Sequence, residues 1–237
     1  MPNTIPRRVT TSCTVSGVSS QNRYSHDGGP MSTRDSYDEI AEDYAERFMD
    51  ELSGKPLDRA LLDLVVAQVN GLGPIADIGC GPGHVARYLH ERGAPTLGID
   101  LSPRMVEIAT SAHPGIGFHT ADMRELHVPD QAWGGMVAFY SIIHIPPPEL
   151  PATFAEFHRV LKPGGVALIS FHLGDEVRHL DEMWEHPVSL DFQFYPRPEI
   201  ESALQEANFA IDAYIERHHY PTEVETTRSY LLAHRVA

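Results

Sequence analysis

The chain has 237 residues, with 42% hydrophobic and 22% charged residues, which is the composition of a globular protein with one large core. Its formal charge of −15, from 18 Lys and Arg against 33 Asp and Glu, disfavours binding to nucleic acid or to an anionic membrane surface. Two cysteines, Cys13 and Cys80, are too few for a disulfide framework. No apolar stretch reaches the roughly 18 residues that cross a bilayer. We therefore expect a cytoplasmic protein.

The N-terminal part of the chain divides into a tail and a helical region. The first residues are rich in Ser, Thr, Pro, Gly and Asn without periodicity, so we predict a disordered tail over 1–34 and one domain over 35–237. From Tyr37 to Phe48 the apolar residues fall on one helical face, and a second helical pattern follows as far as Val69.

From residue 75 onward, short apolar runs alternate with helical patterns. The runs predicted as parallel strands are 75–79, 95–100, 115–120, 134–140 and 166–172, and the predicted helices are 84–92, 102–112, 148–161 and 197–207. This alternation is typical of βαβ units and a doubly wound α/β sheet. Two last runs, 209–217 and 226–235, are joined by a link too short for a crossover and therefore predict an antiparallel hairpin at one edge.

A long insertion, 172–197, separates the fifth predicted strand from the last helix. Loops of this length in a compact domain are usually lids or binding loops, so we expect the insertion to lie over the substrate side. Its alternating apolar residues, which suggest an extended apolar wall, are Val188, Leu190, Phe192 and Phe194. The charged residues at its start also fit a solvated face.

Gly79, Gly81 and Gly83 crowd the turn between the first strand and the helix after it. A strand that runs into a Gly-rich turn and a helix N-terminus is a general solution for holding a nucleotide-like ligand. The spacing is G-x-G-x-G, and His84 stands where a dinucleotide-binding turn has its third glycine. This departure counts against a pyrophosphate ligand, and so against a nicotinamide-dependent oxidoreductase.

An acidic residue marks each of the first three strands. Asp77 lies within the first strand, where a buried carboxylate needs a cation or a fixed donor, or caps the turn. Asp100 ends the second strand, where a carboxylate accepts from both hydroxyls of a ribose. Asp122 follows the third strand, where it accepts from an adenine amino group or caps the next segment. Together they describe a ligand with ammonium, ribose and adenine groups and no phosphate.

These residues lie in motifs that resemble those of class I S-adenosylmethionine-dependent methyltransferases, from about Tyr37 to the C-terminus. The motifs are Asp77–Gly83, Gly98–Pro103 with Met105, Ala121–Met123, and Leu161–Gly165. The resemblance implies a Rossmann-like α/β fold with a seven-stranded sheet of order 3-2-1-4-5-7-6 in which strand seven is antiparallel. It also implies S-adenosylmethionine as the cofactor.

The resemblance further implies roles for single residues. The backbone of the Gly-rich turn approaches the methionine and ribose parts of the cofactor, and Leu101 and Met123 enclose the adenine. The first helix of this family closes over the cofactor, which makes Tyr37 and Tyr44 contacts, although both also fit the packed face of an amphipathic helix. The cofactor-binding residues that we predict are Tyr37, Tyr44, Asp77, Gly79, Cys80, Gly81, Gly83, Asp100, Leu101, Met105, Asp122, Met123 and Tyr140.

The catalytic residue is harder to predict, because methyl transfer needs a base only where the nucleophile must lose a proton. Ligands of such sheets bind at the carboxyl ends of the strands, so candidates follow strands four and five. His144, with an ordinary pKa near 6.5, is our candidate base, and His172 is a second candidate. His144 also fits a role in packing the turn. No His or Cys spacing typical of a metal site occurs, and we expect no metal.

The acceptor is predicted from what the chain lacks. The residues after strand four, Phe139–Ile142, differ from the pattern of an acidic or Asn residue, two prolines and an aromatic found in enzymes that methylate nucleic acid bases. We see no added module for recognising a protein. We therefore predict methyl transfer to an N, O or C nucleophile of a small molecule. The alternatives are a nicotinamide-dependent oxidoreductase and a protein that binds S-adenosylmethionine without methyl transfer.

Overall fold

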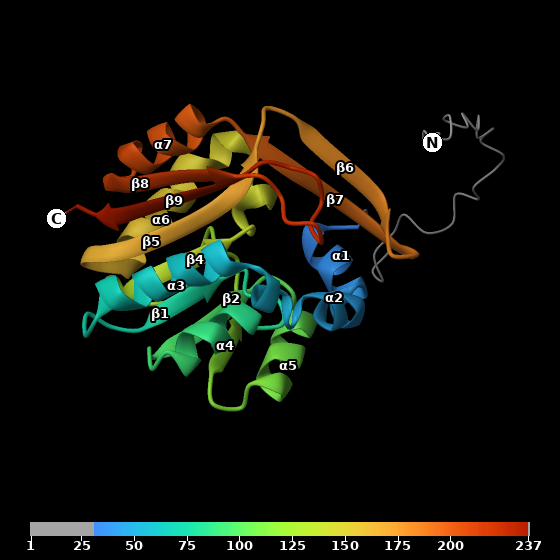
Figure 1. The fold of residues 1–237 in the computed structure, drawn as a ribbon, viewed down its shortest axis with the longest axis horizontal. Coiled ribbons are helices and arrows are strands. Elements are labelled where there is room, and N and C mark those ends of the chain that lie inside the picture. The colour runs from blue at the N-terminus through green and yellow to red at the C-terminus, as the bar shows by residue number, and fades with distance from the viewer. Residues whose placement is uncertain (1–30, 237) are drawn as a thin grey trace, which may run out of the picture.

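Strands and helices alternate through most of the chain (Figure 1). The computed structural model describes residues 31–236. The helices are α1 (Thr33–Glu39), α2 (Ala41–Phe48), α3 (Pro56–Val69), α4 (His84–Glu91), α5 (Pro103–Ala112), α6 (Leu150–Val160) and α7 (Arg197–Glu206). The strands are β1 (Ile75–Ile78), β2 (Thr96–Asp100), β3 (Gly117–Thr120), β4 (Trp133–Phe139), β5 (Leu161–Leu173), β6 (Val177–Met183), β7 (His186–Tyr195), β8 (Phe209–Arg217) and β9 (Arg228–Arg235). None of the helices described is long and apolar enough to cross a membrane.

The main sheet has the strand order β3-β2-β1-β4-β5-β9-β8. Strands β1 to β5 pair in parallel, and β9 lies antiparallel between β5 and β8. If β6 and β7 are left out of the count, β8 is the sixth strand along the chain and β9 is the seventh. The order is then 3-2-1-4-5-7-6 with an antiparallel strand seven, which confirms the prediction. The parallel strands place their carboxyl ends at one edge of the sheet, where α/β proteins bind ligands.

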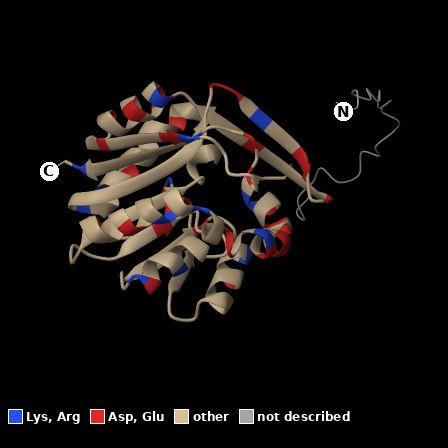
Figure 2. Ribbon diagram, viewed as in Figure 1, with Lys and Arg blue, Asp and Glu red and all other residues tan. Residues whose placement is uncertain are grey.

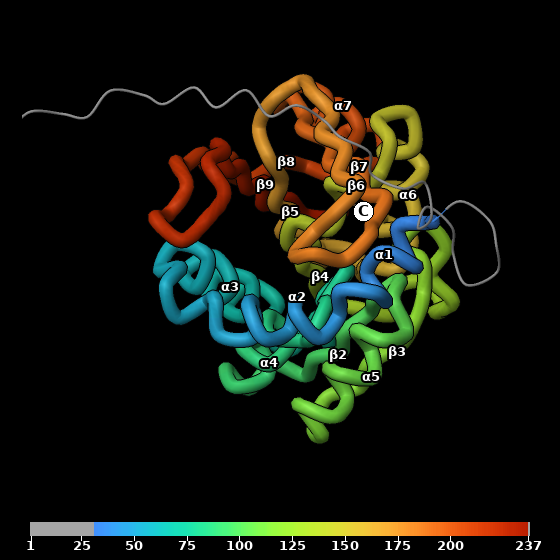
Figure 3. Tube along the Cα trace, turned by 90° about the vertical axis from the view of Figure 1, so that its right-hand side faces the viewer, coloured from blue at the N-terminus to red at the C-terminus, as the bar shows by residue number. Residues whose placement is uncertain are grey.

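The sheet is covered on both faces. In β4, Met136 and Ala138 belong to the apolar cluster formed with α6 and α7, whereas Val137 belongs to the cluster formed with α3 and α4. Successive side chains of a strand point to opposite faces, so this strand contributes to two cores. Figure 3 shows α3 and α4 on one side of the sheet and α6 and α7 on the other. Burial on both faces explains why the predicted strands are apolar runs without alternation.

The segment 172–197 is not the irregular loop that its length suggests. Most of it forms the antiparallel hairpin of β6 and β7, and the start of the segment belongs to β5. The predicted apolar wall corresponds to β7, in which Val188 and Leu190 are buried against Ile40. In β6 every residue before Met183 is exposed, so the sequence offers no apolar period by which to recognise that strand.

The helical region begins earlier than predicted. Helix α1 starts at Thr33, inside the predicted tail 1–34, because a capping box holds its first turn. Asp35 N–H donates to Ser32 Oγ at 3.2 Å, and Ser32 N–H donates to Asp35 Oδ2 at 3.0 Å. Residues 1–30 of the predicted tail lie outside the described residues. The predicted helix to Phe48 is divided into α1 and α2.

A buried cluster of charges joins α3 to the segment between β8 and β9. Asp58 is fully buried and lies 3.1 Å from Arg217, which also pairs with Glu223 at 2.7 Å. The Tyr230 hydroxyl donates to Asp58 at 3.0 Å and lies 2.8 Å from the hydroxyl of Tyr140. Buried charges are tolerated where they are paired, as these are. Through the two tyrosines the cluster reaches the end of β4.

Candidate functional site

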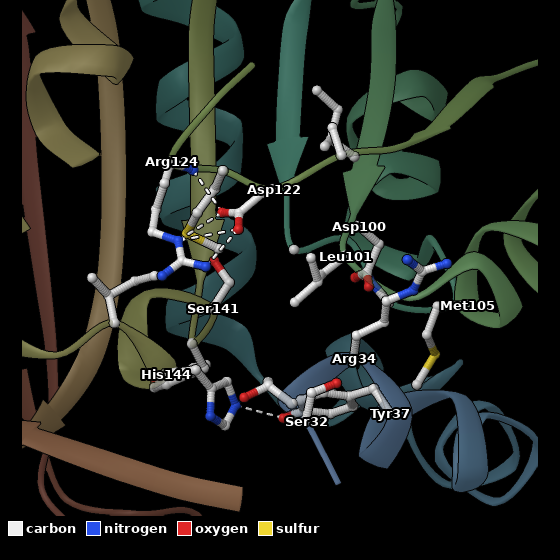
Figure 4. Close-up of a pocket in the computed structure, with 18 of the residues that line it drawn as sticks. Ser32, Arg34, Tyr37, Asp100, Leu101, Met105, Asp122, Arg124, Ser141 and His144 are labelled. Atoms are coloured by element: carbon white, nitrogen blue, oxygen red, sulfur yellow. Dashed lines mark hydrogen bonds and ion pairs between the residues drawn. The ribbon is translucent and has the colours of Figure 1, made fainter. Parts of the chain in front are cut away.

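A cavity of about 530 Å³ opens where the carboxyl ends of β1, β2 and β4 meet (Figure 4). Residues of α1, α2 and β7 form its opposite wall. The predicted residues that line it are Tyr37, Tyr44, Gly79, Gly81, Asp100, Leu101, Met105, Asp122, Met123, Tyr140 and His144. The predicted residues that do not line it are Asp77, Cys80, Gly83 and His172.

The Gly-rich turn brings bare backbone to the cavity wall. Gly79 and Gly81 have φ values of +70° and +52°, in the left-handed region that favours glycine. A Cβ on Gly79 would lie 2.2 Å from the Cβ of Ser141, so no side chain fits at that position. A Cβ on Gly81 would meet Tyr44 at 3.6 Å. Glycine at position 79 therefore lets the turn pack directly against Ser141 while its backbone lines the cavity.

Asp100 ends β2 with its carboxylate at the cavity. Gly81 N–H donates to Asp100 Oδ2 at 2.7 Å, and Ser102 N–H donates to Oδ1 at 2.8 Å. A carboxylate has about four lone-pair positions, so these bonds leave about two for a ligand. Burial raises the pKa of Asp100 to about 6, while the two backbone hydrogen bonds oppose the rise. The carboxylate is therefore ionised at neutral pH, and its remaining lone pairs suit a pair of neighbouring hydroxyls.

An apolar slot lies beside the end of β2. Leu101 and Met123 line it, together with Ile99, Met105 and Ala121. Such a slot suits a flat aromatic ring, because the ring exchanges water contacts on both faces for apolar ones. The predicted enclosure of adenine by Leu101 and Met123 fits this geometry.

Asp122 forms an ion pair with Arg124, a residue that is not among those predicted. Arg124 Nη2 lies 2.6 Å from Asp122 Oδ2, and Arg124 Nη1 lies 2.7 Å from Glu149. Burial opposes ionisation of Asp122, but hydrogen bonds from Arg124 lower its pKa. An adenine amino group would share the oxygens of Asp122 with this guanidinium. The only signal in the sequence is the position of Arg124, two residues after the predicted carboxylate.

Tyr37 and His144 are joined by a hydrogen bond at the cavity (Figure 4). Tyr37 Oη lies 2.7 Å from His144 Nε2, and His144 Nδ1 lies 2.8 Å from the carbonyl oxygen of Asp191 on β7. A carbonyl oxygen only accepts, so Nδ1 carries the proton and Nε2 accepts from the Tyr37 hydroxyl. Burial lowers the pKa of His144 to about 4. The imidazole is therefore neutral at pH 7, with its basic nitrogen directed at Tyr37.

Asp77, Cys80 and Gly83 lie behind the cavity wall. Asp77 is 1% exposed and accepts from Ala86 N–H at 2.9 Å, so it caps α4, which is the alternative role for this residue. The Cys80 side chain belongs to an apolar cluster with Phe118. A Cβ on Gly83 would lie 2.7 Å from the Phe118 ring, so glycine at this position serves packing. The predicted contact between Asp77 and a ligand ammonium group has no support in this geometry.

His172 also lies away from the cavity, which does not support its prediction as a second candidate base. Its ring stacks between Tyr140 and Phe194, with both centroids 5.2 Å away. Its Nδ1 accepts from Arg228 Nη1 at 3.4 Å and lies 3.0 Å from Thr226 Oγ1. Burial and the neighbouring Arg228 cation lower the pKa of His172 to about 3. The geometry makes this imidazole a neutral packing group.

The His172→Asn variant should lose less stability in acid than the unaltered chain. Below a pH of about 6.5 an unfolded histidine takes up a proton that folded His172 does not take up, so acid favours unfolding. Between about pH 6.5 and pH 5 the unaltered chain should lose about 2 kcal/mol more free energy of unfolding than the variant. Urea unfolding at the two pH values, followed by circular dichroism, measures this difference. Equal losses in the two proteins would contradict a neutral, buried His172.

Several polar residues of the wall are not among those predicted. Ser141 Oγ is buried without a hydrogen-bond partner in the described part of the chain, and it lines the cavity at the end of β4. An orphaned hydroxyl at a cavity wall is available to a ligand. Arg34 on α1 and Ser189 and Gln193 on β7 also line the cavity. For Ser189 and Gln193, the sequence signal that could have identified them is their alternation with the apolar residues of β7.

Comparison with known proteins places the central part of the chain in a family. Residues 75–165 match a family model described as a methyltransferase domain. The malonyl-[acyl-carrier protein] O-methyltransferase of Serratia marcescens is 32% identical over 111 residues, which cover 47% of this chain and 43% of that protein. The demethylmenaquinone methyltransferase of Chlorobaculum parvum is 36% identical over 96 residues, which cover 40% of this chain and 39% of that protein.

The fold comparison extends over more of the chain. The solved structure of an S-adenosylmethionine-dependent methyltransferase from Methanosarcina mazei has a TM-score of 0.66 at 17% identity and covers 73% of this chain and 97% of that chain. The curated relatives are matched over less of their length: the chain spans about two fifths of each of the two named above. All four sequence motifs lie within the matched residues 75–165. Residues 75–165 therefore match a methyltransferase domain, and the fold of the chain is similar to that of a solved S-adenosylmethionine-dependent methyltransferase.

Proposed function

We propose that this protein transfers the methyl group of S-adenosylmethionine to a small-molecule acceptor and releases S-adenosylhomocysteine. The observation that carries the proposal is the cavity between the Gly-rich turn, Asp100 and the apolar slot. Its volume of about 530 Å³ lies within the usual range of small-molecule sites. The formal charge of −15 counts against a nucleic acid acceptor.

The residues of the cavity fit the parts of S-adenosylmethionine. Asp100 has lone pairs left for the two ribose hydroxyls, and the slot between Leu101 and Met123 suits the adenine. The backbone at Gly79 and Gly81 lines the cavity, where it would contact the methionine part. The unpartnered Ser141 hydroxyl would bind one of its polar groups. No phosphate-binding element is needed for any of these parts.

In this reaction the residues of the chain position the acceptor, and one of their side chains receives the acceptor's proton. When bound, S-adenosylmethionine supplies a methyl group that its positive sulfur has already activated. Holding the acceptor in line with that methyl group lowers the barrier by several kcal/mol. We assign His144 as the base and Tyr37 as the group through which it acts. The Tyr37 hydroxyl takes the acceptor's proton while it gives its own proton to His144 Nε2.

The acceptor is proposed only as a class. The two curated relatives are named for malonyl-[acyl-carrier protein] and for demethylmenaquinone, which differ from each other. A small molecule with an O, N or C nucleophile is the class that the cavity supports. The polar side chains of β7 that line the cavity, Ser189 and Gln193, are placed to contact the acceptor.

The Asp100→Ala variant should bind S-adenosylhomocysteine at least about tenfold more weakly, which corresponds to about 1.4 kcal/mol. The substitution removes the carboxylate for the ribose and also frees Gly81 N–H, which positions the turn. Calorimetric titration measures the affinity. Glu107→Ala on α5, whose side chain is 64% exposed, is the control and should bind like the unaltered chain. Unchanged affinity of Asp100→Ala would show that the ribose is held elsewhere.

The proposed function is tested with S-adenosylmethionine radiolabelled in its methyl group and a panel of amines, phenols, indoles and carboxylic acids. We expect transfer of the label to at least one class. Binding of S-adenosylhomocysteine without any transfer would favour a protein that uses the cofactor in another way. Binding of NADH in place of S-adenosylhomocysteine would favour the oxidoreductase and contradict the proposal.

A further inference from the structure

The sequence of β6 is complementary to itself in the antiparallel direction. The strand reads V-R-H-L-D-E-M from Val177 to Met183. Antiparallel pairing of two copies about Leu180 gives the cross-strand pairs Val177–Met183, Arg178–Glu182, His179–Asp181 and Leu180–Leu180. Each basic side chain meets an acidic one, and each apolar side chain meets an apolar one. A shift of one residue in either direction breaks this match, and parallel pairing places like charges opposite each other.

The outer edge of β6 is open to such pairing. β7 pairs in parallel with the end of β5, and β6 follows β7 as the last strand on this branch of the sheet. No described strand pairs with the other side of β6. Figures 1 and 3 show it at the outside of the molecule. Val177 and Leu180 are 56% and 37% exposed, although both are apolar. An edge strand offers unpaired N–H and C=O groups to another strand.

β6 is also regular enough to pair. Its register against β7 shifts between Leu180, which pairs with Leu190, and Glu182, which pairs with Pro187. Two steps along β6 therefore match three along β7, so the extra residue lies in β7 and β6 has no bulge. Bulges and charges usually protect an edge from other strands. The charged residues of β6 disfavour pairing with a strand that does not carry the opposite charges at the facing positions. A second antiparallel copy of β6 does carry them.

The basic side chains of β6 form exposed ion pairs within one molecule, and Arg178 also lies 4.4 Å from the centre of the Phe194 ring. Figure 2 shows both signs of charge along this strand. Arg178 pairs with Glu176 at 2.6 Å, and its side chain is 48% exposed. His179 pairs with Asp191 at 2.7 Å, and its side chain is 47% exposed. Exposed ion pairs of this kind contribute little, so these side chains are available to a new partner.

We propose that β6 pairs with β6 of a second copy of this chain and that the protein forms a two-fold symmetric dimer. The two-fold axis passes through the Leu180 pair, so each charge pair forms twice. The sheet then continues from one molecule into the other. β7 lies next to β6 and lends Ser189 and Gln193 to the cavity wall, while its Asp191 carbonyl accepts from His144. The dimer interface therefore lies one strand away from the cavity wall, whichever reaction takes place there.

Sedimentation velocity of the full chain over a wide range of concentrations tests the proposal. We expect a monomer–dimer equilibrium. Arg178→Glu alone and Glu182→Arg alone should each weaken the dimer at least about tenfold, because each places like charges opposite one another. The double variant R178E/E182R restores opposite charges and should recover the dimer. Recovery of the dimer in the double variant would show that residues 178 and 182 pair between two molecules. It could not come from the ion pair of Arg178 with Glu176 in the same molecule, because the double variant does not restore that pair.

Two further measurements keep the test independent of folding. Arg197→Glu on α7, which breaks an exposed pair with Glu201, is the control and should leave dimerisation unchanged. In the unaltered chain, amide hydrogen exchange of Val177–Met183 should slow as the protein concentration rises. A chain that stays monomeric, a dimer that Arg178→Glu does not weaken, or a folded double variant that stays monomeric would each overturn the proposal. None of these outcomes depends on cofactor binding or methyl transfer.

Discussion

Turnover of the His144→Ala variant is expected to fall by about 10²-fold, the lower end of the usual contribution of a general base, because a pKa of about 4 makes His144 a weak base. Its affinity for S-adenosylhomocysteine should stay nearly unchanged, because the residues that we propose for the ribose and the adenine, Asp100, Leu101 and Met123, lie elsewhere on the wall. The reason for the loss is that Nε2 of the neutral imidazole is the only basic nitrogen bonded to the Tyr37 hydroxyl among the described contacts. Initial rates at saturating cofactor and acceptor, with calorimetry for affinity, separate the two quantities.

Tyr37→Phe is the matched variant for this test. It removes the hydroxyl through which His144 acts but keeps the ring that packs against Tyr44 at 6.0 Å. We expect a loss of turnover similar to that of His144→Ala. Because the pKa of His144 is held at about 4, the turnover of the unaltered chain should be level between about pH 6 and pH 8. Full turnover in both variants would show that the acceptor needs no base from this pair.

The Asp58→Ala variant is expected to lose about 3–5 kcal/mol of the free energy of unfolding, the usual cost of removing one partner from a buried ion pair. Asp58 is fully buried, and its loss leaves Arg217, whose side chain is 9% exposed, with Glu223 as its remaining ion-pair partner. It also leaves the hydroxyl of Tyr230 without its acceptor. Burial raises the pKa of Asp58 although Arg217 and Lys55 oppose the rise, so the expected loss comes from the buried partners left behind and not from a net gain of the Asp58 charge itself.

Urea unfolding followed by circular dichroism measures the effect of Asp58→Ala. Asp63→Asn is the control on the same helix, because Asp63 pairs with Arg92 at 3.0 Å where both side chains are substantially exposed, and the amide oxygen still accepts from the Tyr88 hydroxyl. We expect this control to cost less than about 1 kcal/mol. The folded Asp58→Ala protein should also bind S-adenosylhomocysteine more weakly, since Tyr230 supports Tyr140 on the cavity wall. Equal stability of the two variants would contradict the importance of the buried cluster.

Much of the fold can be predicted from the sequence because its signals are local. Parallel strands buried on both faces are apolar runs, and the Gly-rich turn after β1 needs positive φ at Gly79 and Gly81. The hairpin of β8 and β9 follows from the short link between its strands, and the observed β8 has the bounds predicted for it. Asp100 can be placed for the same reason, because the end of a strand fixes where its last side chain lies.

The remaining features depend on contacts between distant segments. The strand β6 is hidden in the sequence because its residues are exposed and charged, so its pairing with β7 leaves no apolar pattern. Asp77 turns toward α4 and His172 toward Arg228, and the sequence does not show to which face either side chain points. The pairing of Tyr37 with His144 joins residues 107 positions apart, and neither residue predicts the other.

Calorimetric titration of the full chain with S-adenosylhomocysteine tests whether the cavity binds this cofactor. We expect saturable binding with one molecule per chain, which Asp100→Ala weakens and Glu107→Ala does not. NADH, titrated under the same conditions, should produce no binding. A folded chain that does not bind S-adenosylhomocysteine, or one that binds it equally well without the Asp100 carboxylate, would show that the cavity is not the proposed cofactor site.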